Sequence, residues 1–209
     1  MGTREVERRV LRDDYEEVVR GALQRHGVTS LAAFPGSYNP PTVAHLAMAA
    51  AAVRQCGVAR VDLVLSRVAL GKESVAGPTV DERAAVLRAV AATRPWLGVV
   101  VTDARLLVDI AILPAQGADR ARGYDWLVLG ADKWEQVLDV AFYDGSALAR
   151  DAAVARLPRL AVAPRLSHAL PAHDDVVVLD VDHHDVSSSA ARAGARDLML
   201  PEAASSGLW

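Results

Sequence analysis

The sequence predicts an α/β fold, in which one doubly wound parallel sheet forms a single domain with an N-terminal helix. Short runs of Val, Leu and Ala recur without polar interruption, which is typical of parallel strands covered on both faces. Helical segments alternate with these runs, as the crossovers of a doubly wound sheet require. The 209 residues suit one such domain and can bury a substantial core.

Six segments are expected as strands, because each is apolar and stops at a glycine, a proline or a polar residue. They are 28–34, 61–65, 99–102, 125–129, 160–163 and 176–181. Residues 43–56 are too long for a typical strand and stop at Gly57, which predicts a buried helix. A second helix is expected over 81–93, with Thr79 or Asp81 as N-cap, and shorter helices after 130 and after the serines at 187–189. Residues 104–123 show no clear pattern.

The two ends of the chain differ from this alternating pattern. Residues 4–26 carry apolar side chains three and four apart among many charges, which predicts an amphipathic helix. We therefore expect a helical extension over 1–26, the main domain over 27–200 and a loose tail over 201–209. The N-terminal helix could cap the domain or mediate association, so a homo-oligomer is an open alternative.

The amino-acid composition indicates which kinds of binding partner and which cellular location to expect. The net charge is −3 with both signs interspersed, so neither a nucleic acid nor an anionic membrane is expected as a partner. The single cysteine, Cys56, fits a reducing compartment. The charged N-terminus does not resemble a signal peptide, and no apolar run reaches the ~18 residues of a membrane span. A cytoplasmic location is therefore expected.

The turn after the first strand carries the strongest functional signal. Gly36 allows close approach of the backbone to a phosphate, and Ser37 and Tyr38 offer N–H groups to it. Thr42 and His45 are three residues apart and share one face of the next helix, so His45 can donate hydrogen bonds to phosphate oxygens. The alternative is that His45 only packs beside an apolar helix.

A second turn near the other end of the chain has a similar character. The sequence predicts a helix that begins at three serines: Ser187 as the N-cap, and Ser188 and Ser189 in the first helical turn. Arg192 lies one turn later. These groups could equally be capping residues and plain surface. Because strand ends of a parallel sheet meet at one edge, the two turns could hold a triphosphate from both sides.

Other candidates are weaker. Lys72 in a glycine-flanked loop could reach a phosphate, Asp132 after Gly130 could bind a ribose or cap a helix, and Arg165 follows the fifth strand. His183 and His184 are adjacent and point to opposite faces of an extended segment, so no bound transition metal is predicted. The sequence contains no G-x-G-x-x-G, G-x-x-x-x-G-K-[ST] or G-x-S-x-G motif.

Three motifs, in the right order, resemble those of the nucleotidyltransferase superfamily. Residues 36–45, GSYNPPTVAH, are similar to its G-[ST]-F-[DN]-P-x-[HT]-x-G-H signature, and residues 186–192, VSSSAAR, to its I-S-S-[ST]-x-[IL]-R signature. Residues 130–132, GAD, match a G-x-D element of the nicotinamide and nicotinate mononucleotide adenylyltransferases. The resemblance covers residues 28–197.

This resemblance implies a Rossmann-like nucleotidyltransferase fold that binds ATP and Mg²⁺, the metal being held through the nucleotide phosphates. A phosphate oxygen of a small phosphomonoester, best matched by nicotinate or nicotinamide mononucleotide, would attack the α-phosphorus of ATP and release pyrophosphate. The implied catalytic residues are His45, Thr42 and Arg192. The implied ATP-binding residues are Gly36, Ser37, Tyr38, His45, Arg165, Ser187, Ser188, Ser189 and Arg192. The implied acceptor-binding residues are Lys72, Gly130 and Asp132.

The sequence departs from the family pattern in places. Ala44 replaces the signature glycine, and Ala190 and Ala191 precede Arg192 where a branched residue is usual. No aromatic residue for stacking a pyridine ring can be placed, although Trp96, Trp134, Phe142 or Tyr143 could supply one. Three alternatives therefore stay open: a phosphopantetheine adenylyltransferase, a CTP-dependent cytidylyltransferase, and a non-catalytic nucleotide-binding module on the same fold.

Overall fold

The structure is a computed structural model that describes residues 30–68, 77–113, 123–165, 168–172, 175–183 and 185–209. The helix expected over 1–26 and the loop that holds Lys72 lie outside the described residues.

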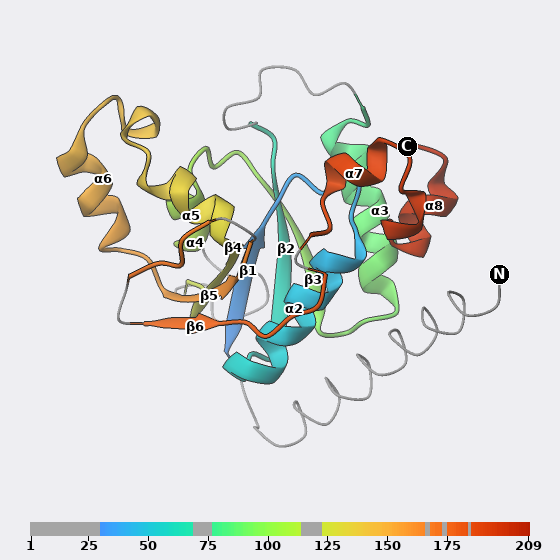
Figure 1. Ribbon diagram of the computed structural model, residues 1–209, viewed down its shortest axis with the longest axis horizontal. Helices are drawn as coiled ribbons and strands as arrows, with labels where there is room; N and C mark the ends of the chain where they lie inside the picture. The colour runs from blue at the N-terminus through green and yellow to red at the C-terminus, as the bar shows by residue number, and fades with distance from the viewer. Residues whose placement is uncertain (1–29, 69–76, 114–122, 166–167, 173–174, 184) are drawn as a thin grey trace.

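Within the described residues, six parallel strands form one sheet in the order β3-β2-β1-β4-β5-β6, which confirms the doubly wound fold (Figure 1). The strands are β1 (Leu31–Pro35), β2 (Arg60–Ser66), β3 (Leu97–Thr102), β4 (Trp126–Gly130), β5 (Arg159–Ala163) and β6 (Val176–Val178). The chain proceeds outward in one direction from β1 to β3 and then in the other from β4 to β6. The topological switch point, where ligands bind in such sheets, therefore lies between β1 and β4.

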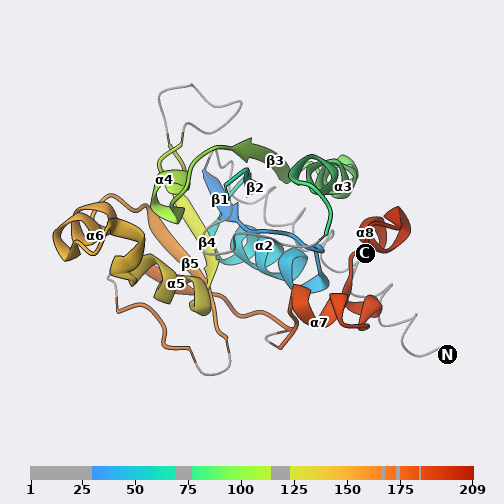
Figure 2. The ribbon, with the colours of Figure 1, turned by 90° about the horizontal axis from the view of Figure 1, so that it is seen from above.

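Helices cover both faces of the sheet (Figure 2). They are α2 (Val43–Cys56), α3 (Val80–Ala92), α4 (Leu107–Ala111), α5 (Ala131–Leu138), α6 (Ala147–Val154), α7 (Ser188–Arg192) and α8 (Pro201–Ser206), with 3₁₀ turns η1 (Val140–Tyr143) and η2 (Arg196–Leu198). Buried residues of α2 and α3 form one core cluster with one face of the sheet, and α4 and α5 pack on the other face. Of the residues that the structure describes, none forms a helix long and apolar enough to cross a membrane.

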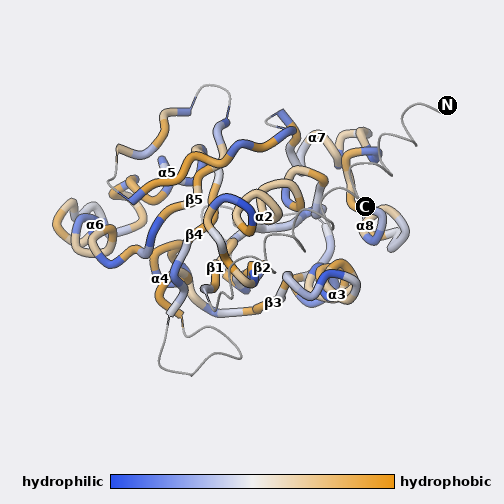
Figure 3. Tube along the Cα trace, turned by 90° about the horizontal axis from the view of Figure 1, so that it is seen from below, coloured by the Kyte–Doolittle hydropathy of each residue, from blue (hydrophilic) through white to orange (hydrophobic). Residues whose placement is uncertain are grey.

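The strand pattern explains the two cores. In β1, Ala32 and Phe34 point to the α2–α3 side and Ala33 points to the opposite side, as alternation along a strand requires. All three side chains are buried, so the strand has no polar face. Figure 3 shows hydrophobic stretches of the chain gathered along the sheet.

The alanines of α2 let this helix pack closely on the sheet. Five successive buried side chains at 49–53 are Ala or Val, and the helix has the expected bounds of 43–56. It ends at Gly57, whose φ of 64° is the left-handed conformation typical of a helix C-cap.

The C-terminal residues differ from the prediction. Residues 201–209, expected as a loose tail, contain α8, which packs on α3. Glu202 forms a 3.0 Å ion pair with Arg94, whose side chain is only 1% exposed, and Ala203 is buried. A six-residue helix gives too short a pattern to be recognised, and its ion-pair partner lies 108 positions earlier in the sequence. The sixth strand is also shorter than expected and ends at Val178.

Candidate functional site

The candidate site lies at the carboxyl ends of β1 and β4. Residues 36–42, here named the signature loop, lead from β1 into α2, and Gly130 at the end of β4 leads directly into α5. The loop after β5 and the segment 186–192, here named the late turn, approach the same region.

The aromatic ring of Tyr38 shapes the signature loop from within. The ring is fully buried, and its hydroxyl donates a 2.5 Å hydrogen bond to the carbonyl of Phe34. A Cβ at Gly36 would lie 3.0 Å from this ring, so the close packing itself favours glycine there. The Gly36 N–H is used within the sheet, because it donates to the Val64 carbonyl at 3.1 Å.

His45 is held by the residue that caps its own helix. Thr42 is the N-cap of α2, and its backbone N–H donates to Nδ1 of His45 at 3.0 Å. The Thr42 hydroxyl lies 2.8 Å from the same nitrogen. A capping box normally uses Glu or Gln at the third helical position, and here His45 takes that place. Because Nδ1 accepts the bond, the ring proton belongs on Nε2.

The charge state of His45 follows from its surroundings. Burial, and to a smaller extent the positive charge of Arg165, lowers the pKa of His45 to about 4. The ring is therefore neutral near pH 7, and it offers one donor, Nε2–H, rather than a full positive charge.

The late turn meets the signature loop directly. The Ser188 hydroxyl donates to the Pro40 carbonyl at 2.8 Å, and Nη1 of Arg192 donates to the Asn39 carbonyl. The structure thus brings together the two turns that the sequence places near opposite ends of the chain. Both of these hydrogen bonds run from the late turn to the signature loop, so they join the two turns to each other.

The other two serines also have partners within the late turn. Ser187 is the N-cap of α7, as expected, and its hydroxyl accepts the Ala190 N–H at 3.1 Å. Nη2 of Arg192 donates to the Ser189 hydroxyl at 3.1 Å.

Arg165 connects three parts of the site. Its Nη1 donates to the Val186 carbonyl at 2.8 Å, and its Nε lies 3.7 Å from Oδ1 of Asp132. Its positive charge also lowers the pKa of His45, although burial of the ring lowers it more. A Cβ at Gly130 would lie 2.4 Å from Asp132 Oδ1, so glycine leaves room for this carboxylate.

Two residues outside the signature loop, Arg83 and Trp209, contact it, and Asn39 within the loop receives one of these contacts. Arg83 on α3 donates through Nη1 to the Ser37 carbonyl. The Asn39 side chain is 1% exposed, and its Oδ1 accepts a 2.6 Å hydrogen bond from the Trp209 indole. Asn39 belongs to the signature motif at residues 36–45, so the motif could have identified it as a site residue. Arg83 and Trp209 lie in no motif, so no local sequence signal identifies them.

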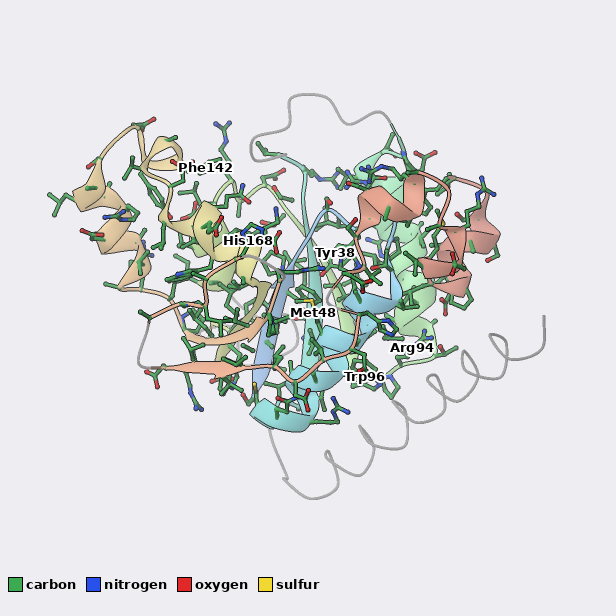
Figure 4. All side chains as sticks on the ribbon, viewed as in Figure 1. Tyr38, Met48, Arg94, Trp96, Phe142 and His168 are labelled. Carbon is green, nitrogen blue, oxygen red and sulfur yellow. The ribbon has the colours of Figure 1, made fainter. Side chains whose placement is uncertain are left out.

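The four aromatic candidates for ring stacking are not equivalent. Trp96, Trp134 and Tyr143 are buried in the cores, with 4%, 7% and 8% of their surface exposed. Phe142 is half-buried and lies on η1, next to the end of α5, far from Trp96 (Figure 4). Phe142 is therefore the least buried of the four, although it also packs against the core cluster on the α4–α5 side of the sheet.

Only one histidine of the 183–184 pair lies within the described residues. His183 has a positive φ of 68°, and His184 lies outside the described residues. Among the residues that are described, no three His, Cys, Asp or Glu side chains gather as metal ligands would.

Comparisons with known proteins agree with this fold. Two solved structures of Plasmodium falciparum nicotinic acid mononucleotide adenylyltransferase are similar to the chain at 13% identity. The complex with NaAD gives a TM-score of 0.56, with 85% of this chain and 94% of the other covered. The complex with APC gives 0.54, with 84% and 92% covered. No curated protein matches the sequence. The family model described as cytidylyltransferase-like matches residues 33–194, so the chain belongs to the cytidylyltransferase-like family.

Proposed function

We propose that this member of the family transfers AMP from ATP to a small phosphomonoester and releases pyrophosphate. The best candidate for the acceptor is nicotinate or nicotinamide mononucleotide, which would place the enzyme in NAD biosynthesis. The observation that carries the proposal is the junction of the signature loop and the late turn beside His45, at the β1/β4 switch point.

The proposed reaction needs no covalent enzyme intermediate. A phosphate oxygen of the acceptor forms a bond to the α-phosphorus of ATP, and the bond from that phosphorus to the α–β bridging oxygen breaks. The bridging oxygen leaves with its electron pair as part of pyrophosphate. Positioning and stabilisation of the charge on the phosphate oxygens supply the catalysis.

In this proposal His45 acts as a neutral donor. Its Nε2–H donates to an oxygen of the transferring phosphate, while Nδ1 stays bonded to Thr42. The side chain of Thr42 is fully buried, so Thr42 acts through His45 rather than by touching the nucleotide.

Cationic and hydroxyl groups surround the expected path of the triphosphate. The backbone N–H groups of Ser37 and Tyr38, together with residues 187–189, are proposed to bind phosphate oxygens. Arg192 has five N–H donors, and its bonds to Asn39 and Ser189 leave capacity for a phosphate. Arg165 adds a second positive charge beside them.

Asp132 and Phe142 are the proposed acceptor-binding residues within the described structure. Asp132 is partly exposed at the end of β4, where it can accept a hydrogen bond from a ribose or a substrate amide. The half-buried ring of Phe142 is proposed to stack on a pyridine ring. Lys72 stays a prediction, because its loop lies outside the described residues.

Mg²⁺ is proposed to enter with the nucleotide. Magnesium is usually bound by substrate phosphates and water with only one or two carboxylates, and Asp132 is the carboxylate of the described site nearest to Arg165. The ion would neutralise phosphate charge as the α-phosphorus is attacked. We also propose a cytoplasmic location, where ATP and phosphorylated metabolites are available.

One observation favours a second candidate. The matching family model is described as cytidylyltransferase-like, so CTP in place of ATP, with a sugar- or alcohol-phosphate acceptor, is the alternative to test.

The test is a product analysis. The protein is incubated with Mg²⁺ and either ATP or CTP, together with nicotinate mononucleotide, nicotinamide mononucleotide, phosphopantetheine or glycerol 3-phosphate in turn. We expect pyrophosphate release and a dinucleotide of the expected mass with ATP and one pyridine mononucleotide. Turnover with CTP and not with ATP would contradict the proposed function and support the CTP-dependent alternative. Nucleotide binding without turnover of any acceptor would favour a non-catalytic module.

A further inference from the structure

The backbone of the signature loop is bonded, residue by residue, to the C-terminal part of the chain. The carbonyls of three successive residues accept hydrogen bonds from it. The donors are the Arg192 guanidinium to Asn39, the Ser188 hydroxyl to Pro40 at 2.8 Å and the Leu200 N–H to Pro41 at 3.1 Å. The next residue, Thr42, pairs with Met199 in an isolated antiparallel bridge. Because prolines have no N–H, their carbonyls are the only backbone groups through which residues 40 and 41 can be held.

The side chain of Asn39 is held from the same direction. Its Oδ1 accepts the 2.6 Å hydrogen bond of the Trp209 indole, which can only donate, so the bond fixes which end of the amide faces Trp209. Trp209 is in turn positioned by Arg196, whose Nη2 donates to the Trp209 carbonyl at 2.7 Å. The Trp209 side chain also packs against a small apolar cluster that contains Met199 and Ala203.

This C-terminal part is itself anchored to α3. The buried Arg94 guanidinium pairs with Glu202 of α8 and also donates to the Val90 carbonyl at 2.6 Å. Val86 of α3 belongs to the same apolar cluster as Ala203. Residues 188–209 therefore form a fixed support on the core, here named the clasp.

The clasp connects to His45 through one residue. Thr42 pairs with Met199 of the clasp on one side and donates its N–H to Nδ1 of His45 on the other. A shift of the signature loop would move this N–H and release the ring from its single tautomer.

We propose that the clasp positions His45 through the signature loop, with Trp209 as a positioning residue that holds Asn39. This inference rests on the proposed function only for what His45 does to the nucleotide. The positioning itself is a property of the protein without substrate, and it can be measured there.

The experiment compares Trp209→Phe with Leu208→Ala by long-range ¹H–¹⁵N spectra of the His45 ring in the unliganded full chain. Trp209→Phe keeps an aromatic ring and removes the donor to Asn39. Leu208→Ala removes apolar packing from the same cluster without touching that bond. We expect the wild-type and Leu208→Ala rings to carry the proton on Nε2 alone, and the Trp209→Phe ring to show an averaged mixture of both tautomers.

Turnover gives a second readout if the proposed function holds. Trp209→Phe should lower kcat by about tenfold with little change in KM for nucleotide, because it misplaces a catalytic group rather than a binding one. Leu208→Ala should keep kcat. Identical ring signals in Trp209→Phe and the wild type would overturn the positioning role, whatever the turnover.

A third variant covers the case in which Trp209→Phe does not fold. Ser188→Ala removes one donor to the loop carbonyls and leaves the core unchanged, and it should also mix the two His45 tautomers in the unliganded protein. An unchanged ring in Ser188→Ala would then count against the clasp. Absence of turnover in the wild type would defeat the proposed function, while the ring signals would still decide this inference.

Discussion

The backbone N–H of Thr42 donates a 3.0 Å hydrogen bond to Nδ1 of His45, and this bond places the ring proton on Nε2. One helix cap thus does two things: it satisfies an N–H at the start of α2, and it sets the tautomer of the histidine proposed to face the phosphate.

Replacing His45 by Ala should lower kcat by about 10² or more, because one donor to the developing charge is lost. Steady-state kinetics with the substrate pair found by product analysis measure this. His168→Ala is a matched control, since His168 pairs with Glu135 at 2.8 Å and is not bonded to Thr42 as His45 is. An equal loss of kcat in both variants would contradict a catalytic role for His45.

Thr42→Val removes the hydroxyl beside Nδ1 and keeps the backbone N–H and the shape of the side chain. Since one of two contacts to the ring remains, we expect a loss of kcat of about tenfold, smaller than that of His45→Ala. The KM for nucleotide should stay near the wild-type value, because Thr42 is fully buried. A large rise in KM with unchanged kcat would show that Thr42 touches the substrate.

The pKa of His45 predicts a dependence of stability on pH. Its value of about 4 in the folded protein is lower than the usual value of 6.5, so the unfolded chain binds a proton that the folded protein does not. This contribution to the free energy of unfolding is full above pH 6.5 and is lost as the pH falls from 6.5 towards 4. Urea unfolding at pH 7 and pH 5 measures it. His45→Gln should show a smaller difference between the two pH values, and an identical difference would assign the loss to other groups.

Gly130→Ala should disturb the acceptor side of the site. The new Cβ would lie 2.4 Å from Asp132 Oδ1 and 3.3 Å from Arg165 Nε, so these two side chains must move away from it. We expect a rise in KM for the acceptor that exceeds the rise for nucleotide. Gly145→Ala is the control without such a contact, since a Cβ there meets no atom within 4 Å. Because the φ of Gly145 is 77°, Gly145→Ala should lower the stability of the protein and leave both KM values unchanged. An unchanged KM for the acceptor in Gly130→Ala would contradict the prediction.

Glu202→Ala should destabilise the protein by about 3 kcal/mol, because it leaves the buried Arg94 without its carboxylate. The free energy of unfolding in urea gives the value. The exposed pair Arg67–Asp81 is the comparison: Asp81→Ala should cost about 0–1 kcal/mol, since both side chains face solvent. Equal costs would mean that α8 is not anchored by its ion pair.

Much of the fold could be predicted because it depends on local patterns. Strand β4 is a run of buried apolar residues before Gly130, and α2 stops at a glycine, so both were visible in the sequence. Thr79 was also visible as an N-cap, and its hydroxyl accepts the Glu82 N–H at 3.2 Å. The junction of the two turns followed from parallel strands, whose carboxyl ends share one edge.

The rest depends on contacts between distant residues. Trp209 lies 170 positions from Asn39, and Arg94 lies 108 from Glu202, so no window of sequence contains either pair. Helix α4 (Leu107–Ala111) was missed because five residues are too few for a periodic pattern. The capping role of His45 was missed because Glu or Gln is the usual residue at that position.

In the proposed function, the signature loop and the late turn hold one nucleotide with its α-phosphate at His45. A crystal structure of the protein with a non-hydrolysable ATP analogue and Mg²⁺ would locate each phosphate. We expect an α-phosphate oxygen at about 3 Å from His45 Nε2, and β- and γ-phosphates beside Arg192. A nucleotide bound elsewhere, or one whose phosphates point away from Nε2, would contradict this expectation.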